Sequence, residues 1–128
     1  MVNTATADTT NTDTTALPVI YTMRVLKKFT DPQRSSQYFV RKALDDLAYT
    51  IDTTILPKII NPCTYMVWAN RARARGYSPG GVAATEMAWR RLARDCRNAK
   101  ASDVYTVKLV WQMFFDLAAR YGVKVEVV

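Results

Sequence analysis

The chain has 128 residues, of which 49% are hydrophobic and 23% charged, so it is neither fibrous nor wholly disordered and fits one folded domain. Eighteen Lys and Arg against eleven Asp and Glu give a formal net charge of +7, which favours a polyanionic partner without choosing among DNA, RNA and anionic membrane. Histidine is absent, which excludes Ser-His hydrolases and His-ligated metal sites. We therefore expect a protein that is not an enzyme and uses no cofactor.

Residues 1–17 form a polar segment with seven Thr, two Asn, two Asp and no Lys or Arg. It has no periodic apolar face, so it cannot fold by itself. We expect an extended, Thr-rich N-terminal arm outside a folded domain of residues 18–128. The alternative is a terminal tail without function.

Proline and capping signals divide the first half of the domain. Residues 19–25 fit both helical and strand spacing. Asp31-Pro32 predicts the start of a long amphipathic helix that runs through Ile55 and is ended or interrupted at Pro57. Asn61-Pro62 gives a second start signal of the same kind, a capping residue followed by proline, for a second helix that ends at Gly76.

The second half of the domain predicts two more helices and a tail. The third runs from about Pro79 to Asn98, and the fourth runs from caps at Ser102 and Asp103 to Gly122. The fourth helix is apolar on most sides, which suits either a central position or a contact between subunits. Residues 123–127 alternate as a strand would, and without an evident partner strand they form a loose end or pair with another chain. The predicted fold class is all-α, a bundle of about four helices.

The large and reactive side chains have simple structural interpretations. Each of the last three helices carries one Trp, which we expect to anchor the core, with stacking on nucleic-acid bases as the alternative. Cys63 and Cys96 are too few for a disulfide scaffold or a zinc site, so we expect core residues. The longest uncharged stretch, residues 59–70, is too short to span a membrane, and no signal peptide opens the chain. We expect a soluble protein that is not exported by a signal peptide.

Residues 71–100 hold most of the positive charge, with eight cations against two carboxylates. On a helix, Arg90, Arg94 and Arg97 share an arc of about 60°, beside the predicted buried face. Arg73 points away from Arg71 and Arg75, so that helix could grip on two sides. Planar guanidinium groups bind phosphate oxygens bidentately. The predicted nucleic-acid-binding residues are Arg71, Arg73, Arg75, Arg90, Arg91, Arg94, Arg97 and Lys100.

Other patterns in the chain limit this interpretation. No motif that reads bases is present, so we expect binding to the phosphate backbone. A solvated basic face, countered by acidic patches of a neighbour, is the alternative. Asp45 and Asp52 share a helix face, but with no further ligand in reach we expect solvated carboxylates and no metal site. Tyr121 lies on an apolar face without a general base, so no catalytic residue is predicted.

A Thr-rich arm, a helical bundle divided by prolines, two Arg-dense helices, no His and a length near 130 residues resemble the major capsid proteins of filamentous and rod-shaped archaeal viruses of the rudivirus, lipothrixvirus and tristromavirus type. The resemblance implies that identical or paralogous subunits wrap linear double-stranded DNA, held in the A form, inside a helical virion assembled in the host cytoplasm. It also implies that the seven predicted arginines face DNA and that the arm reaches neighbouring subunits. Asp8 and Asp13 make the arm acidic, so we expect it to pack on protein rather than on phosphate.

Two other functions remain open from the sequence. One is a small dimeric helical DNA-binding regulator that does not polymerise, and the other is an RNA-associated helical protein. Filaments formed with DNA would indicate a capsid protein, whereas discrete dimers would indicate a regulator.

Overall fold

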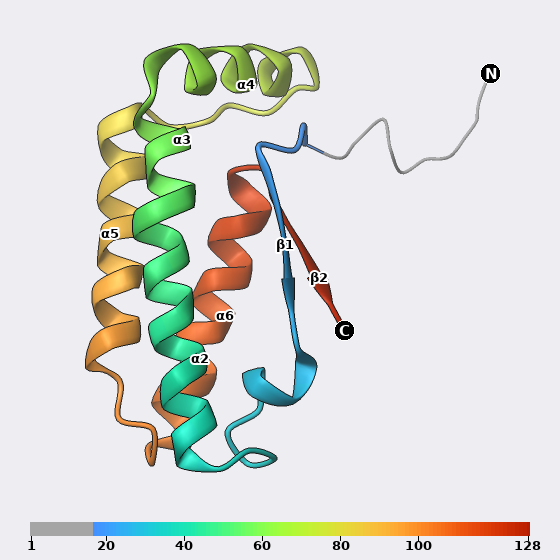
Figure 1. The fold of residues 1–128 in the computed structure, drawn as a ribbon. Helices are drawn as coiled ribbons and strands as arrows, with labels where there is room; N and C mark the ends of the chain where they lie inside the picture. The colour runs from blue at the N-terminus through green and yellow to red at the C-terminus, as the bar shows by residue number, and fades with distance from the viewer. Residues whose placement is uncertain (1–16) are drawn as a thin grey trace, which may run out of the picture.

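The computed structural model describes residues 17–128, so the expected arm falls almost entirely outside the described residues (Figure 1). The described chain folds into helices that pack side by side, with a short two-stranded ribbon along one side of them. The elements are β1 (Tyr21–Val25), a 3-10 turn (Lys27–Thr30), α2 (Gln37–Thr50), a π-helical turn (Ile51–Ile55), α3 (Leu56–Ile60), α4 (Pro62–Ala74), α5 (Val82–Asn98), α6 (Val104–Arg120) and β2 (Val123–Val127).

The expected bundle of about four helices is confirmed. The segment from α2 through α3 is one continuous helix, because a π-helical turn joins the two and Leu56 donates its amide hydrogen to the Ile51 carbonyl five residues back. Pro57 interrupts the helix as expected without ending it. Proline has no amide hydrogen and its ring crowds the preceding turn, and we attribute the wider turn just before Pro57 to that conflict.

Two expected helix starts are wrong. Asp31-Pro32 does not begin a helix: the Asp31 carboxylate accepts from the Gln33 amide at 3.0 Å and closes a local turn, and α2 begins only after Ser36. The third helix begins at Val82 rather than Pro79, because Gly81 is extended and the Gly80 carbonyl accepts a hydrogen bond from the Tyr65 hydroxyl. In both places a side-chain hydrogen bond stabilises a turn ahead of the helix.

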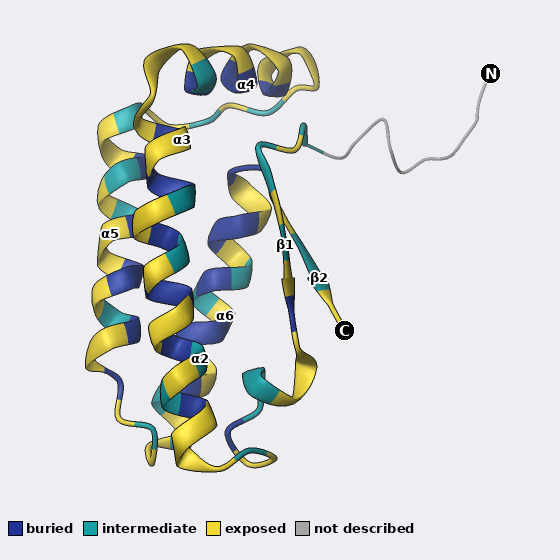
Figure 2. Ribbon diagram, in the orientation of Figure 1, coloured by how far each residue is buried: buried dark blue, intermediate teal, exposed yellow. Residues whose placement is uncertain are grey.

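The core lies where α2, α5 and α6 face one another and the ribbon. Figure 2 shows the buried positions of these helices turned inward and the exposed positions turned outward. Trp89, Phe114 and Leu44 are among the largest fully buried side chains, each worth about 2 kcal/mol or more of burial. α6 packs on both α5 and β2, so its broad apolar surface fits its central position in the folded molecule.

β1 and β2 pair in parallel, with Tyr21 opposite Val123 and Val25 opposite Val127. This pairing corrects the expectation that the C-terminal tail has no partner strand within the chain. The partner strand, β1, lies in the segment of residues 19–25, whose spacing fits both helix and strand. All the helices lie between the two strands in the sequence and together form the crossover connection that a parallel pair requires.

Gly122 closes the fold at the turn between α6 and β2. Its φ of +73° lies in the left-handed region, and a Cβ atom there would overlap the Trp68 indole and the Pro18 carbonyl. Those two groups are joined by a hydrogen bond of 2.8 Å from the indole nitrogen to the carbonyl oxygen. One glycine therefore lets α4, the entry to β1 and the start of β2 meet.

Among residues 17–128, no helix is long and apolar enough to cross a membrane.

Candidate nucleic-acid interface

α4 carries three of the predicted arginines. Asn61 caps its start by accepting from the Thr64 amide at 3.1 Å, and Trp68 and Ala72 bury one face of the helix. Arg71 and Arg75 line a groove beside the segment that leads into β1, whereas Arg73 lies on the far side of the helix and donates to Asn70. The three arginines therefore lie on two sides of α4, as their helical spacing predicts. We call Arg71, Arg73 and Arg75 the α4 patch.

α5 carries four of the predicted arginines on its exposed side, and two of them are already ion-paired. Arg90 donates to Glu86 one turn earlier at 2.7 Å. Arg97 pairs with Asp52 in the π-helical turn of the neighbouring helix. These partners explain why two members of the predicted ridge are less available to an external phosphate.

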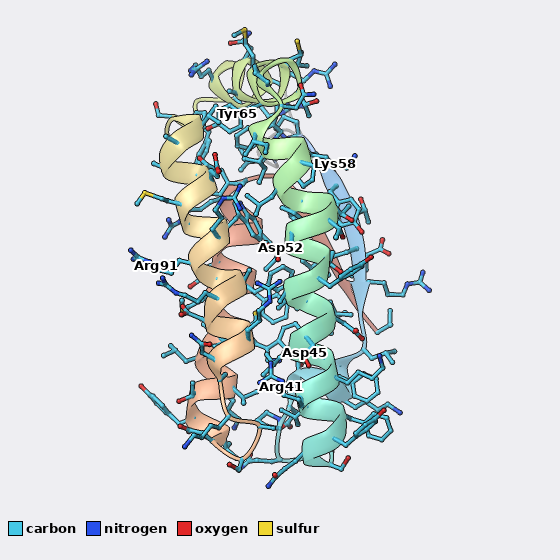
Figure 3. The ribbon with its side chains drawn as sticks, turned by 60° about the vertical axis from the view of Figure 1, so that its left-hand side comes forward. Arg41, Asp45, Asp52, Lys58, Tyr65 and Arg91 are labelled. Atoms are coloured by element: carbon cyan, nitrogen blue, oxygen red, sulfur yellow. The ribbon has the colours of Figure 1, made fainter. Side chains whose placement is uncertain are left out.

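Arg91 and Arg94 differ from their paired neighbours. Both are exposed, and no carboxylate of residues 17–128 lies within ion-pair distance of either guanidinium. In Figure 3 Arg91 points away from the helices. Lys100, just beyond the end of α5, is also exposed. We call Arg90, Arg91, Arg94, Arg97 and Lys100 the α5 patch.

Arg120 belongs beside this patch, although the sequence analysis did not include it. It lines a groove of about 370 Å³ between α5 and α6 together with Arg91 and Asp116. Arg120 follows the apolar run of α6, so only the packing of α6 on α5 reveals its position near Arg91. One carboxylate between two guanidiniums leaves the rim of this groove positively charged.

The two patches do not form one surface. α4 lies across the end of the helical pair, and its arginine-bearing end points away from α5 toward the ribbon side of the molecule (Figure 1). The α5 patch begins halfway along α5 and continues toward the opposite end of the bundle. A continuous Arg-rich stretch of sequence thus becomes two cationic surfaces facing different directions.

Ion pairs on the surface of the bundle account for the two carboxylates, Asp45 and Asp52, that share a helix face. Asp45 accepts from Arg41 at 2.8 Å and 3.1 Å, and Asp52 pairs with Arg97. Arg41 also donates to the Ala99 carbonyl at the end of α5, an intramolecular role that the sequence analysis missed. Among residues 17–128 no three His, Cys, Asp or Glu side chains gather as metal ligands would.

The three Trp side chains of the last three helices are confirmed as core anchors. Trp68, Trp89 and Trp111 are at most 4% exposed, so none of them offers a ring face to a base. Tyr121 is buried against Trp68, with ring centroids 6.1 Å apart. Base stacking on the tryptophans, the alternative interpretation of these residues, therefore has no support in the fold.

The two cysteines differ from each other. Cys96 is buried as expected, and desolvation raises the pKa of its thiol to about 12, which keeps it protonated and unreactive. Cys63 is exposed on α4, so the expectation that it is a core residue is wrong. It lies at the start of α4 and lines a groove with Val67 and with Pro18, on the segment that leads into β1.

Comparison with protein families, with curated proteins and with solved structures finds no match to this chain.

Proposed function

We propose that the chain is a non-catalytic structural nucleocapsid protein that binds double-stranded DNA through its phosphates and polymerises around it into a helical virion filament. Its partners are the DNA backbone and further copies of itself or a paralogous subunit. The observation that supports this proposal best is the set of exposed guanidiniums without carboxylate partners among residues 17–128. On α4 and α5 that set is Arg71, Arg73, Arg75, Arg91 and Arg94, and Arg34 and Arg120 are exposed and unpaired elsewhere in the described chain.

The ion pairs within the chain leave these five arginines without a negative partner, which favours an external anion as their ligand. The described carboxylates that form ion pairs neutralise other cations, as Asp45 does for Arg41 and Glu126 does for Arg24. Five arginines thus remain solvated on two helices, and guanidinium is the side chain best suited to bidentate phosphate contacts. Phosphate contacts position a protein on a duplex without reading its sequence.

Arg90 and Arg97 enter the proposal as secondary contacts. Each must exchange a carboxylate for a phosphate, and exposed ion pairs of this kind contribute only about 0–1 kcal/mol, so the exchange is feasible but adds little. The primary contacts are the unpaired arginines of both patches, with Lys100 beside them.

The separation of the two patches supports assembly around DNA. The two patches lie on helices that run in different directions, α4 across one end of the bundle and α5 along its side, so a duplex that touches both would have to follow the surface around the molecule. Either the duplex bends around the subunit or two subunits enclose it from different sides. Both arrangements suit a filament that wraps DNA, and the resemblance to archaeal virus capsid proteins points to the same kind of assembly.

A binding titration tests the proposal. Fluorescence anisotropy with a labelled duplex, repeated across a salt series, should show log affinity falling linearly and steeply with log salt, with hardly any difference between a duplex and its scrambled version. Negative-stain images of the same mixtures should show filaments. A strong preference for one short site together with discrete dimers would establish the regulator instead, and tighter binding to an RNA duplex would favour the RNA-associated alternative.

A further inference from the structure

The ribbon leaves one strand edge open. Within residues 17–128 the sheet consists of β1 and β2 only, although parallel strands usually belong to larger sheets covered on both faces. The free edge of β1 faces α2 across a groove of about 280 Å³ lined by Arg24, Leu26 and Ala43. β2 packs on β1 and α6, and Figure 1 shows no helix beyond its other edge.

The hydrogen bonds to β1 show which backbone groups of β2 face the open edge. The Val128 amide donates to Val25 at 2.9 Å, the Val128 carbonyl accepts from Lys27 at 2.7 Å, and the Gly122 carbonyl accepts from Ile20 at 2.7 Å. Gly122 and Val128 therefore direct their backbone groups toward β1. Successive residues of a strand alternate in direction, so the odd-numbered positions 123, 125 and 127 point their N–H and C=O groups to the outside, where no other strand of residues 17–128 meets them.

The side chains of β2 alternate as well. Its sequence is Val-Lys-Val-Glu-Val: the valines share the face that begins buried at Val123, whereas Lys124 and Glu126 share the opposite face with Arg24 of β1. Protein edge strands often carry charges of one sign that repel a second strand. β2 instead carries one charge of each sign, placed symmetrically about Val125.

This symmetry makes the strand complementary to an antiparallel copy of itself. When Val125 lies opposite Val125 of a second copy, Lys124 lies opposite Glu126, and the same pair forms again across the two-fold axis. The outward backbone groups of positions 123, 125 and 127 then meet as hydrogen-bonded pairs. The Lys–Glu pairs occupy the intervening non-hydrogen-bonded positions, where facing Cα atoms are only about 4.5 Å apart and the side chains are closest.

We propose that β2 strands of two copies pair antiparallel about Val125 and form a two-fold dimer with a continuous four-stranded sheet, in the order β1-β2-β2-β1. The register that satisfies the open backbone groups is the same register that pairs every charge, and this agreement carries the proposal. The Glu126 carboxylate lies 4.0 Å from the Arg24 guanidinium of its own chain and is still partly exposed. It can therefore also form an ion pair with Lys124 of the second copy. The dimer needs no nucleic acid, so it is independent of the proposed DNA binding.

One strand pair buries less surface than a permanent interface, so this dimer is reversible and its population rises with protein concentration. Sedimentation velocity on the full chain without nucleic acid, over a range of concentrations, measures it directly. Wild-type protein should shift from monomer to dimer. Lys124→Glu and Glu126→Lys each place like charges opposite one another twice, so each should raise the dimer Kd by about tenfold or more.

An equimolar mixture of the two charge-reversed variants provides the decisive comparison. In a mixed pair every facing charged position joins a glutamate to a lysine, so the mixture should dimerise although neither variant does so alone. Lys58→Glu, an exposed change on α3 with the same effect on net charge as Lys124→Glu, is the matched control and should dimerise at least as well as the wild type.

Three results would overturn the proposal: a wild type that stays monomeric at every concentration, charge-reversed variants that dimerise like the wild type, or a mixture that fails to dimerise. Helical circular dichroism checks that each variant is folded. If a single variant were unfolded, the double variant K124E/E126K would decide, because it restores both cross-strand pairs and must then dimerise like the wild type.

Discussion

At the scale of single residues, an ion-pair partner matters more than sequence position in deciding which arginines are free. Arg90 and Arg94 lie one turn apart on α5, yet Glu86 holds only Arg90. The spacing of Glu86 and Arg90 is visible in the sequence as a favourable i,i+4 pair. The pairing of Arg97 with Asp52 joins residues 45 positions apart, and only the folded chain shows it.

Gly122 gives a sharp test of the packing at one residue. Gly122→Ala should lower the free energy of unfolding by about 3 kcal/mol, because a left-handed φ is strained for alanine and the new methyl group meets Trp68 and the Pro18 carbonyl. Urea denaturation followed by circular dichroism measures the change.

Gly76 is the matched control for that substitution. It also has a positive φ, +84°, but nothing lies within 4 Å of a Cβ atom there. Gly76→Ala should therefore cost only the backbone strain, about 1 kcal/mol. Equal losses at the two sites would show that the close meeting of segments at Gly122 does not exist in solution.

At the scale of elements, strong local signals predicted the helices, and long-range contacts determined the rest. Amphipathic periodicity located the continuous helix around α2, and the Asn61-Pro62 signal marked the start of α4 correctly. The same kind of signal failed at Asp31-Pro32, because an Asp that accepts from a backbone amide stabilises a turn as readily as a helix start. The β1–β2 pairing joins the two ends of the folded domain, and no local pattern reports such a contact.

The candidate site shows the same division between local and long-range information. The exposure of the predicted arginines follows from periodicity, because the buried face of α5, including Trp89 and Leu92, fixes the opposite side. The separation of the α4 patch from the α5 patch depends on how α4 crosses the end of the bundle, and the inclusion of Arg120 depends on how α6 packs. Neither follows from spacing along the chain.

The N-terminal arm can be tested as an element of its own. Leu17 is the first described residue, and its partly buried side chain packs against the hydrophobic core. Deletion of residues 1–16 keeps this contact, so the helical circular dichroism signal and the melting temperature should stay nearly unchanged. We expect the same deletion to impair filament formation with DNA, because the arm is expected to contact neighbouring subunits. Assembly as efficient as that of the full chain, seen by negative stain and sedimentation, would show that the arm is an idle tail.

At the scale of the whole molecule, a packed helical core separates two cationic surfaces from a strand edge with symmetric charges. The α4 and α5 patches face different directions, and the open edge of β2 lies on the side opposite α5 (Figure 1). In the function that we propose, the molecule contacts DNA at two places while it contacts another copy at a third. Such an arrangement suits an assembly better than a single-site regulator.

The salt dependence of DNA binding by two matched double variants tests the central claim most directly. R91Q/R94Q and R90Q/R97Q each remove two positive charges from the same helix, but only Arg90 and Arg97 are ion-paired in the free protein. R91Q/R94Q should flatten the slope of log affinity against log salt by up to about two units, whereas R90Q/R97Q should change it by less than about one. Equal slopes for wild type and R91Q/R94Q, with both variants folded, would contradict the claim that unpaired guanidiniums hold the DNA phosphates.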